Sequence, residues 1–460
     1  MPLPPIDDTI AAIATAPGEG AIGVVRVAGP EAFALADRLF RPRSGARPSR
    51  SPGHRVLVGT VTEGAEPIDE GLLLTFRAPA SYTGQDAVEL QTHGGPAVLR
   101  RVLDACLRSA ARAAGPGEFT LRAYLAGKMD LVQAESVLAV VQAQSERARR
   151  TAAHGLTRRL SDHLHDLQDR LVAAYGDLTA VLDYPEEGVE LRDVRPVLSE
   201  VRERVAELLA TAEAGALVRR GARLALAGRP NAGKSSLLNA LLGYDRSIVS
   251  DRPGTTRDYL EAPLDLDGVP ITAIDTAGVR RTGDDVEAFG VRSALELAER
   301  ADLVLVLLDG SRPLDDDDRD LLRRTPAARR LVLITKSDLP RAWATPLGGH
   351  AGGDPGGPEP GERWIPLSAP QGAGIVALRS AVRERLLGDA VGSELWIQHE
   401  RHAEALRRVA AALDRCRDAP EDLMAIDLAE ALDSLAALTG RGEIAEDALA
   451  HVFANFCVGK

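Results

Sequence analysis

The sequence predicts three folded parts: an α+β N-terminal domain, a helical-bundle domain, and an α/β domain inserted between the two halves of the helical domain. Two observations lead to this prediction. A chain of 460 residues is too long for one hydrophobic core and is typical of two to four domains. The spacing of apolar residues also changes along the chain, from mixed strands and turns to helical spacing, then to strands alternating with helices, then back to helical spacing. Such alternation indicates a doubly wound parallel sheet.

These changes of pattern place the boundaries of four segments. Residues 1–124 mix short β-rich runs, such as Gly20–Val27, with turns rich in glycine and proline. Residues 125–218 and 388–460 carry Leu, Ala and Val at the spacing of amphipathic helices, interrupted near Asp183–Pro185. Between them, residues 219–387 contain five apolar runs that we predict to be strands: 224–227, 271–274, 303–308, 331–334 and 365–367.

Composition restricts the class of protein. Hydrophobic residues make up 45% of the chain, yet no stretch approaches the roughly 20 apolar residues of a membrane span. The N-terminal residues lack the pattern of a signal peptide. The three cysteines are too scattered for a disulfide framework or a zinc site. A net charge of -12 argues against non-specific binding of nucleic acid. We therefore expect a cytoplasmic protein with neither a membrane nor DNA as partner, in which an RNA substrate needs a local basic patch or a partner protein.

Lysine is scarce: only four of the 55 Lys and Arg residues are lysine, at positions 128, 234, 336 and 460. Arginine replaces lysine well wherever any cation serves, so each remaining lysine marks a position where a compact ammonium or a flexible stem is needed. Codon drift with chance survivors is the alternative. We interpret all four positions as candidate site residues.

A phosphate-binding loop lies in the α/β segment. Gly228–Ser235 matches the pattern G-x-x-x-x-G-K-[ST] and follows the predicted strand 224–227. In such a loop the glycines let backbone N–H groups surround the phosphates, Lys234 reaches the terminal phosphates, and the Ser235 hydroxyl binds Mg2+. The predicted nucleotide contacts here are Asn231, Ala232, Gly233, Lys234, Ser235 and Ser236.

A second phosphate-sensing motif follows the strand 271–274. Its residues are Asp275, Thr276, Ala277 and Gly278, and in this position an Asp can hold magnesium through water while the glycine N–H senses the terminal phosphate.

The next strands predict guanine recognition. Asp338 can accept hydrogen bonds from the N1–H and the exocyclic amine of guanine, which adenine cannot donate, while the Lys336 stem covers the base. Backbone N–H groups of Ser368 and Ala369 are placed to reach the guanine oxygen. The order of these motifs resembles that of Ras-like G domains in the translation-factor-related class of GTPases. Thr335 departs from that class, which usually has Asn there, and loosens the expected guanine contact.

The switch segments leave the water-positioning group open. Ras-type GTPases use a Gln directly after D-x-x-G, whereas this chain has Val279, which cannot orient water. Acidic candidates follow at Asp284, Asp285 and Glu287. The loop before the second motif contains the run G-T-T-R-D, in which Thr256 is placed to bind Mg2+. Its predicted nucleotide contacts are Ser250, Asp251, Arg252, Pro253, Gly254, Thr255 and Thr256.

Taken with the helical flanks and the C-terminal Phe-Cys-Val-Gly-Lys, these motifs resemble the MnmE/TrmE family of tRNA uridine-modification GTPases over essentially the whole chain. The resemblance implies that K+ fills the space of an arginine finger and offsets developing negative charge. It also implies that Glu287 is catalytic and orients the water, although a solvated helix charge is the alternative. The implied K+ contacts are Asn231, Ser250, Arg252 and Thr255.

The same resemblance implies a folate site in the N-terminal domain, formed by Arg26, Glu89, Lys128 and the C-terminal Lys460. A carboxylate can read the donor-rich edge of a pteridine, and cations suit its glutamyl tail. Structural roles for Arg26 and Glu89 stay open. Cys457 is a candidate catalytic thiol in a mobile tail, or a small packing residue, whereas Cys106 and Cys416 lie on apparent helical faces and are expected to pack.

The function implied by the resemblance is a potassium-dependent GTPase that modifies C5 of the wobble uridine of tRNA. It would add aminomethyl or carboxymethylaminomethyl groups, with the one-carbon unit from 5,10-methylene-tetrahydrofolate and glycine or ammonium completing the group. The implied partners are a second copy, giving a homodimer, and an MnmG/GidA-type flavoprotein that holds FAD and NADH in a heterotetramer. The alternative is a ribosome- or RNA-assembly GTPase that acts as a switch without modification chemistry.

Overall fold

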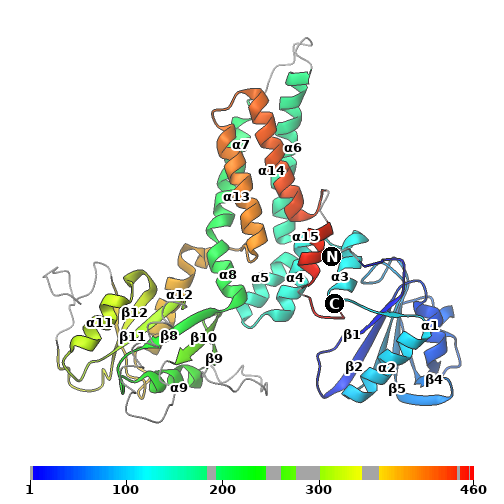
Figure 1. Cartoon of the computed structure of the whole chain (residues 1–460), viewed down its shortest axis with the longest axis horizontal. Coiled ribbons are helices and arrows are strands. Elements are labelled where there is room, and N and C mark those ends of the chain that lie inside the picture. Colours follow the sequence, from blue (N-terminus) through cyan, green and yellow to red (C-terminus); the bar gives the residue numbers. More distant parts are fainter. Residues whose placement is uncertain are drawn as a thin grey trace. The chain divides into compact units, whose positions relative to one another are not determined.

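The structure is a computed structural model that describes residues 4–183, 193–244, 261–275, 301–343, 362–442, 446–454 and 456–459. It divides into two compact units (Figure 1). Unit 1 comprises Met1–Val141, His154–Val197 and Arg415–Lys460, and unit 2 comprises Gln142–Ala153 and Leu198–Asp414. Each unit contains one sheet and part of the helical residues. The predicted domain boundaries at residues 124, 218 and 387 stay predictions.

Unit 1 contains a seven-stranded sheet in the order β3-β4-β5-β6-β2-β1-β7. Neighbouring strands are antiparallel except β1 and β7. The helices α1 and α2 share one hydrophobic core with the strands, which confirms the predicted α+β fold. The bounds are β1 Ile10–Ile13, β2 Gly20–Ala28, α1 Ala32–Leu39, β3 Phe40–Pro42, β4 Arg55–Glu63, β5 Glu66–Phe76, β6 Ala87–Gly94, α2 Pro96–Ser109, β7 Arg112–Ala113 and α3 Glu118–Leu125, with a short 3-10 turn at Pro48–Arg50.

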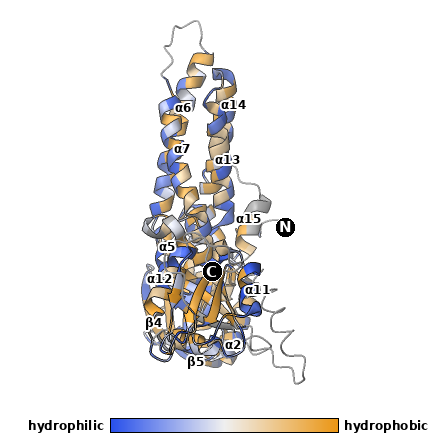
Figure 2. Ribbon diagram, turned by 90° about the vertical axis from the view of Figure 1, so that its left-hand side faces the viewer, coloured by the Kyte–Doolittle hydropathy of each residue, from blue (hydrophilic) through white to orange (hydrophobic). Residues whose placement is uncertain are grey.

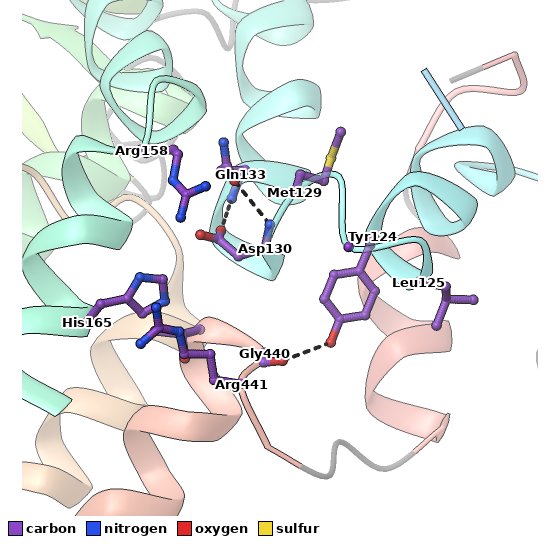
Figure 3. A pocket seen from close by; sticks show the side chains of 11 residues that line it. Tyr124, Leu125, Met129, Asp130, Gln133, Arg158, His165, Gly440 and Arg441 are labelled. Atoms are coloured by element: carbon purple, nitrogen blue, oxygen red, sulfur yellow. Dashed lines mark hydrogen bonds between the residues drawn. The ribbon is translucent and has the colours of Figure 1, made fainter. Parts of the chain in front are cut away.

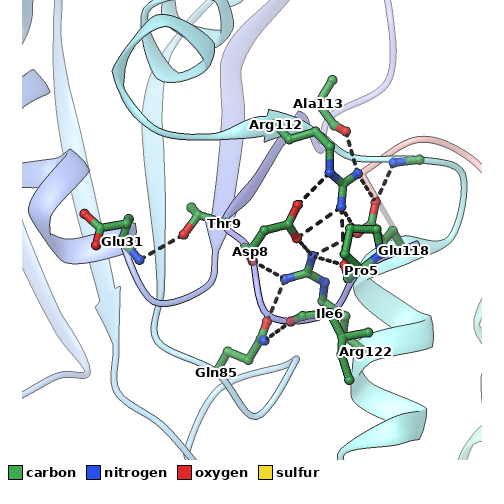
Figure 4. Close-up of polar contacts among 11 residues, drawn as sticks. Pro5, Ile6, Asp8, Thr9, Glu31, Gln85, Arg112, Ala113, Glu118 and Arg122 are labelled. Atoms are coloured by element: carbon green, nitrogen blue, oxygen red, sulfur yellow. Dashed lines mark hydrogen bonds and ion pairs between the residues drawn. The ribbon is translucent and has the colours of Figure 1, made fainter. Parts of the chain in front are cut away.

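A buried network of charges ties the N-terminal residues to β7 and α3 (Figure 4). Glu118, only 1% exposed, accepts from Arg112 Nη2 at 2.7 Å and from Arg122 Nη2 at 2.9 Å. Asp8 accepts from the same two arginines at 2.7 and 2.6 Å. Burial by itself raises the pKa of Glu118, but the hydrogen bonds from Arg112, Gly115 and Arg122 hold that pKa below its ordinary value. Two carboxylates therefore match two guanidinium groups, of which Glu118 and Arg122 are buried and Asp8 and Arg112 are partly exposed.

Long helices complete unit 1. The helices α6 and α14 lie side by side and bury leucines at intervals of three and four residues, for example Leu160, Leu164, Leu167 and Leu171 in α6 (Figure 1). Most of their exposed residues are hydrophilic, with exceptions such as Val172 and Ile426, and each helix shows both colours in Figure 2. No helix among the described residues has an apolar stretch of the length needed to cross a bilayer. The bounds are α4 Leu131–Gln142, α6 Arg159–Asp183, α14 Glu421–Thr439 and α15 Glu446–Ala454, while α5 Glu146–Leu156 lies mostly in unit 2.

Unit 2 contains a six-stranded sheet in the order β13-β12-β11-β8-β10-β9. All pairs are parallel except β9 and β10, so the sheet is mixed where the sequence predicts a parallel one. The five predicted strands are present, and β9 is an additional antiparallel edge strand. The bounds are β8 Ala222–Ala227, α9 Lys234–Tyr244, β9 Glu261–Leu266, β10 Val269–Asp275, β11 Leu303–Asp309, α11 Asp316–Arg324, β12 Arg330–Thr335, β13 Trp364–Pro366 and α12 Ile375–Leu387.

Three further helices belong mainly to unit 2. Arg202 of α7 and Asp414 of α13 form a two-point ion pair, with both N–O distances 3.0 Å. Two 3-10 turns lie at Ala327–Arg329 and Gly388–Gly392. The helix bounds are α7 Arg195–Ala210, α8 Ala212–Arg220 and α13 Glu400–Cys416, which confirms the return to helical structure after the α/β segment.

Candidate functional site

The phosphate-binding loop connects the buried strand β8 to the first turn of α9. Two residues in it have left-handed backbone, Asn231 with φ 62° and Gly233 with φ 97°. Gly233 suits such a conformation because it has no Cβ, whereas Asn231 is one of the few other residue types that adopt it readily. The turn they form starts α9 directly at Lys234, so the free N–H groups of the helix start face the loop.

Lys234 lies inside this loop. Its side chain is buried, and Nζ donates to Gly228 O at 2.5 Å and to Arg229 O at 2.9 Å. These contacts hold the ammonium against the backbone of the loop that would surround the phosphates. Ser235 follows on the exposed side of the first turn. The loop therefore offers both a cation and an oxygen ligand to a nucleotide with Mg2+.

Thr335 joins the phosphate loop to the end of β12. The buried hydroxyl Oγ1 lies 2.8 Å from Ala232 O of the loop and 3.1 Å from Leu308 O of β11. One hydroxyl carries one proton, so it donates to one carbonyl at a time or is shared between the two. Thr335, which departs from the usual Asn, thus connects the two parts of the site by a side-chain hydrogen bond.

We expect Thr335→Val to weaken both the fold of unit 2 and nucleotide binding. Valine keeps the shape of threonine but removes the hydroxyl, so the buried carbonyls of Ala232 and Leu308 lose their hydrogen-bond donor. This loss should lower the free energy of unfolding by about 1–3 kcal/mol. Urea unfolding and titration with a fluorescent GTP analogue measure the two effects. The matched control is Thr439→Val, because Thr439 is equally buried and donates only within its own helix. Equal GTP affinity in both variants would contradict the role given to Thr335.

Lys336 occupies a constrained position beside the same strand end. It has left-handed backbone with φ 55°, and its Nζ lies 2.6 Å from Asp309 Oδ2. Burial by itself raises the pKa of Asp309, but hydrogen bonds from Lys336 and Ser311 keep that pKa below its ordinary value. Asp309 was not predicted as a site residue, although an Asp directly after the apolar run 303–308 is a signal for one. The ion pair fixes the lysine ammonium next to the predicted base position.

The remaining guanine contacts lie around the ends of β12 and β13. Ser337 N donates to Leu367 O at 3.1 Å, which brings the segment with exposed Asp338 beside the segment with Ser368. Ser368 N donates to Ala373 O at 3.0 Å, so this amide is engaged within the fold and differs from the expected free donor. Within the described residues Ala369 N has no hydrogen bond, and the predicted contact to the guanine oxygen rests on it.

Several predicted residues lie outside the described part of the chain. The strand β10 ends at Asp275, and the contacts expected after it and in the preceding loop are not described. These residues, whose roles stay predictions, are Ser250, Asp251, Arg252, Pro253, Gly254, Thr255, Thr256, Thr276, Ala277, Gly278, Glu287 and Lys460.

A second cluster lies in unit 1, where the structure brings together two predicted folate residues. Arg26 of β2 and Glu89 of β6 are direct cross-strand partners, and Nε of the arginine donates to Oε1 of the glutamate at 2.9 Å. The aromatic rings of Tyr82 and Phe119 lie 5.5 and 5.6 Å from the guanidinium carbon. Tyr82 was not predicted. Its hydroxyl lies 2.9 Å from Thr120 Oγ1, and burial raises its pKa. Both side chains of the ion pair are largely buried.

The C-terminal tail reaches this cluster. Val458 pairs with Pro116 in an isolated bridge, and Arg26 Nη1 lies 3.4 Å from Gly459 O. Gly459 has φ 98°, and a Cβ there would lie 2.4 Å from Ile13 O, so the position requires glycine. Cys457, in the same tail, is exposed. The tail is thus docked on the N-terminal domain of its own unit.

Lys128 lies at the surface of unit 1, whereas Cys106 and Cys416 lie in its interior. Lys128 Nζ donates to Pro79 O at 2.9 Å, in the loop that also carries Tyr82, and it is exposed. Cys106 and Cys416 are buried, as predicted for packing residues, and burial raises the pKa of their thiols to about 12 and about 11. Among the described cysteines only Cys457 is accessible for chemistry.

A phosphate loop between a central parallel strand and a helix, beside a strand end that carries Thr335, Lys336 and Asp338, defines a GTP-binding protein of the P-loop class. The family models "GTP-binding protein TrmE N-terminus" and "MnmE helical domain" match residues 9–128 and 131–457. The chain belongs to the MnmE family of tRNA modification GTPases.

Full-length relatives support this membership. A tRNA modification GTPase MnmE of Thermus thermophilus is 51% identical over 457 residues, which cover 99% of this chain and 100% of that protein. The MnmE proteins of Roseiflexus sp. and Laribacter hongkongensis are 40% and 43% identical, with at least 98% of each chain covered. Among solved structures, the G domain of the T. maritima FeoB protein matches at 26% identity with a TM-score of 0.26, over 36% of this chain and 98% of that one, and at this score it adds nothing to the relatives.

Proposed function

We propose that this tRNA modification GTPase couples potassium-dependent GTP hydrolysis to modification of C5 of the wobble uridine in tRNA. The reaction adds an aminomethyl or carboxymethylaminomethyl group in the cytoplasm. The observation that carries the proposal is that one chain contains both a GTP-type phosphate loop with Lys234 and a second cluster, Arg26–Glu89, on which its C-terminal tail docks. GTP hydrolysis then drives domain closure, and the uridine chemistry takes place elsewhere.

The loop residues fit the implied cations. Ser235 presents its hydroxyl on the exposed side of the first turn of α9, and Asn231 is exposed at the left-handed turn. Hydroxyl and amide oxygens are suitable ligands for hard cations such as Mg2+ and K+. When bound, these cations offset negative charge on the phosphates. The chain's own contribution is to hold Lys234 and the helix N–H groups in place before the nucleotide arrives.

The second cluster suits a one-carbon tetrahydrofolate. Glu89 offers a carboxylate to the donor-rich edge of a pteridine, the partly exposed Tyr82 supplies an aromatic face, and Lys128 supplies a cation for the glutamyl tail. The folate, 5,10-methylene-tetrahydrofolate, supplies the carbon, and glycine or ammonium supplies the amine. We further propose a homodimer that joins an MnmG/GidA-type flavoprotein carrying FAD and NADH in a heterotetramer.

Replacing potassium by sodium should lower the GTPase rate strongly, because the smaller sodium ion cannot reach all of the oxygen ligands proposed for potassium. Glu287→Ala should remove most of the activity in potassium, by about 10²-fold or more, because the water loses its orienting carboxylate. Phosphate release in the two salts measures both effects. Glu384→Ala, which removes an exposed glutamate from α12, is the control and should stay fully active. Equal GTPase rates in potassium and sodium would contradict the proposed role of K+ in GTP hydrolysis.

Isothermal titration with 5-formyl-tetrahydrofolate tests the second cluster. Arg26→Ala should weaken binding by about tenfold or more, since it removes a charged hydrogen-bond donor and leaves Glu89 unpaired. Arg43→Ala is the control, because Arg43 pairs with Glu70 at 2.9 Å on the exposed surface of the same sheet. Absence of folate binding would favour the alternative function, a ribosome- or RNA-assembly GTPase that acts as a switch. Mass spectrometry of wobble nucleosides from cells lacking the protein decides between them.

A further inference from the structure

A cavity of about 350 Å³ lies within unit 1, between the segment that follows α3, the start of α6 and the end of α14 (Figure 3). Its lining includes Asp130, His165, Arg158 and Arg441, and it includes neither Arg26, Glu89 nor Lys128. Figure 3 shows the two guanidinium groups, the imidazole ring and the carboxylate gathered on one side of this hollow, across from Tyr124. None of the residues that line the cavity is predicted for the folate or nucleotide site, although Gly127 and Met129 flank Lys128.

Two acceptor atoms at this cavity lack partners. Asp130 Oδ1 accepts from Gln133 N at 2.8 Å and caps α4, whereas its Oδ2 is buried without a hydrogen bond among the described residues. The same holds for Nε2 of His165, a residue that is only 6% exposed. Burial and the nearby charge of Arg441 lower the pKa of His165, while Asp130 and Asp162 act in the opposite direction. A neutral ring can accept at Nε2, so both atoms call for a hydrogen-bond donor.

Two guanidinium groups at the same cavity keep donors available. Arg158 and Arg441 each lie 3.5 Å from a carboxylate, that of Asp162 and that of Asp169, and both of these carboxylates are well exposed. Such long surface pairs bind weakly and use few of the five N–H groups of a guanidinium. Arg158 also has left-handed backbone with φ 67°, a conformation that residues with a Cβ rarely adopt and that is common at functional positions.

We propose that this cavity binds a small α-amino acid. The carboxylate of the ligand accepts from the guanidinium groups of Arg158 and Arg441, and its ammonium donates to Asp130 Oδ2 and His165 Nε2. A phosphate or a simple carboxylate would satisfy only the arginines, would leave both acceptors unpaired and would meet the negative charge of Asp130. A zwitterion satisfies both sides at once, which is why we favour it over an anion.

Binding of an amino acid in this cavity does not depend on the proposed function. The role of the bound amino acid as the amine donor for the modified uridine rests on that function. Binding to the full chain, measured without GTP, folate or tRNA, tests the site, whereas GTPase rates and folate titration test the function. A failure of one therefore leaves the other measurable.

Isothermal titration with glycine, acetate and methylamine is the decisive experiment, because acetate and methylamine each carry one of the two charged groups. We expect glycine to bind at least about tenfold more tightly than either, since each charged hydrogen-bonding partner adds about that factor. Asp130→Asn retains the Oδ1 cap of α4 but loses the charge, and it should weaken glycine binding about tenfold. Arg441→Gln should do the same. Asp166→Asn, on α6 and paired with Arg170, should leave binding unchanged.

Three results would overturn the proposal. Acetate that binds as tightly as glycine would show that the ammonium is not recognised. Inorganic phosphate or a tRNA stem-loop that binds through Arg158 and Arg441 without competition from glycine would make the cavity an anion or RNA site. Absence of amino-acid binding to the wild-type chain, with its fold verified by circular dichroism, would show that the unpaired atoms have another purpose.

Discussion

Lys234→Met should reduce GTP hydrolysis by about 10²–10³-fold or more, because it removes the ammonium that meets the terminal phosphates while keeping the aliphatic stem. In the structure Nζ donates to two carbonyls of the loop, Gly228 O and Arg229 O, so methionine also deprives these carbonyls of their donor. Single-turnover phosphate release, together with nucleotide titration, separates loss of catalysis from loss of binding.

The matched control for this variant is Arg223→Ala. Arg223 is an exposed cation on β8, the strand that leads into the loop, and its removal should leave hydrolysis unchanged. Circular dichroism on both proteins verifies that the sheet is intact. A Lys234→Met protein that hydrolyses GTP at the wild-type rate would place the active phosphate site elsewhere in the chain.

Glu118→Gln should lower the free energy of unfolding of unit 1 by about 3–5 kcal/mol, because it breaks a buried charge network by removing one partner. Arg112 and Arg122 would then share the single remaining carboxylate, that of Asp8. Urea unfolding followed by circular dichroism measures the change. Glu70→Gln, in an exposed pair with Arg43, is the control and should cost at most about 1 kcal/mol.

The difference in unfolding free energy between the wild type and Glu118→Gln should depend on pH. The folded-state pKa of Glu118 lies below its ordinary value, so the stabilisation by its charge is complete above the unfolded-state pKa. It is lost as the pH falls through the folded-state pKa, where the wild-type carboxyl becomes protonated. The difference in stability between the wild type and Glu118→Gln should therefore be largest near neutral pH and shrink in acid. A constant difference across this range would contradict a charged role for Glu118.

The sequence alone predicts those parts of the site whose residues are neighbours in the chain. The phosphate loop and its strand and helix are an example, because a phosphate demands a fixed backbone curve and leaves a fixed local pattern. The antiparallel strand β9 was missed because Glu261–Leu266 is short, contains Pro263 and lies at a sheet edge, where patterning is weak. The helical segments were visible because buried leucines repeat along them.

Contacts between distant residues could not be predicted in the same way. Arg26 and Glu89 are 63 residues apart, and only the register of β2 and β6 places them opposite each other. Both residues were predicted from the resemblance to a family, because nothing in their sequence spacing indicates that they are in contact. The hydroxyl bridge of Thr335 and the ion pair of Lys336 with Asp309 likewise depend on how strands pair. The cavity at Asp130 and His165 depends on three segments that meet only in the folded chain.

The docked tail affects the order in which the protein can fold during synthesis. Unit 1 draws its sheet from residues 10–113, yet α14 and residues 456–459 are synthesised only after residues 198–414, which belong to unit 2. The segment 198–414 must therefore be synthesised before Val458 can pair with Pro116 and Gly459 can reach Arg26. A nascent chain stalled before α15 should expose Leu121 and Leu131, which pack against Phe453 and Phe456, to chaperones, and synthesis through residue 459 should abolish the exposure.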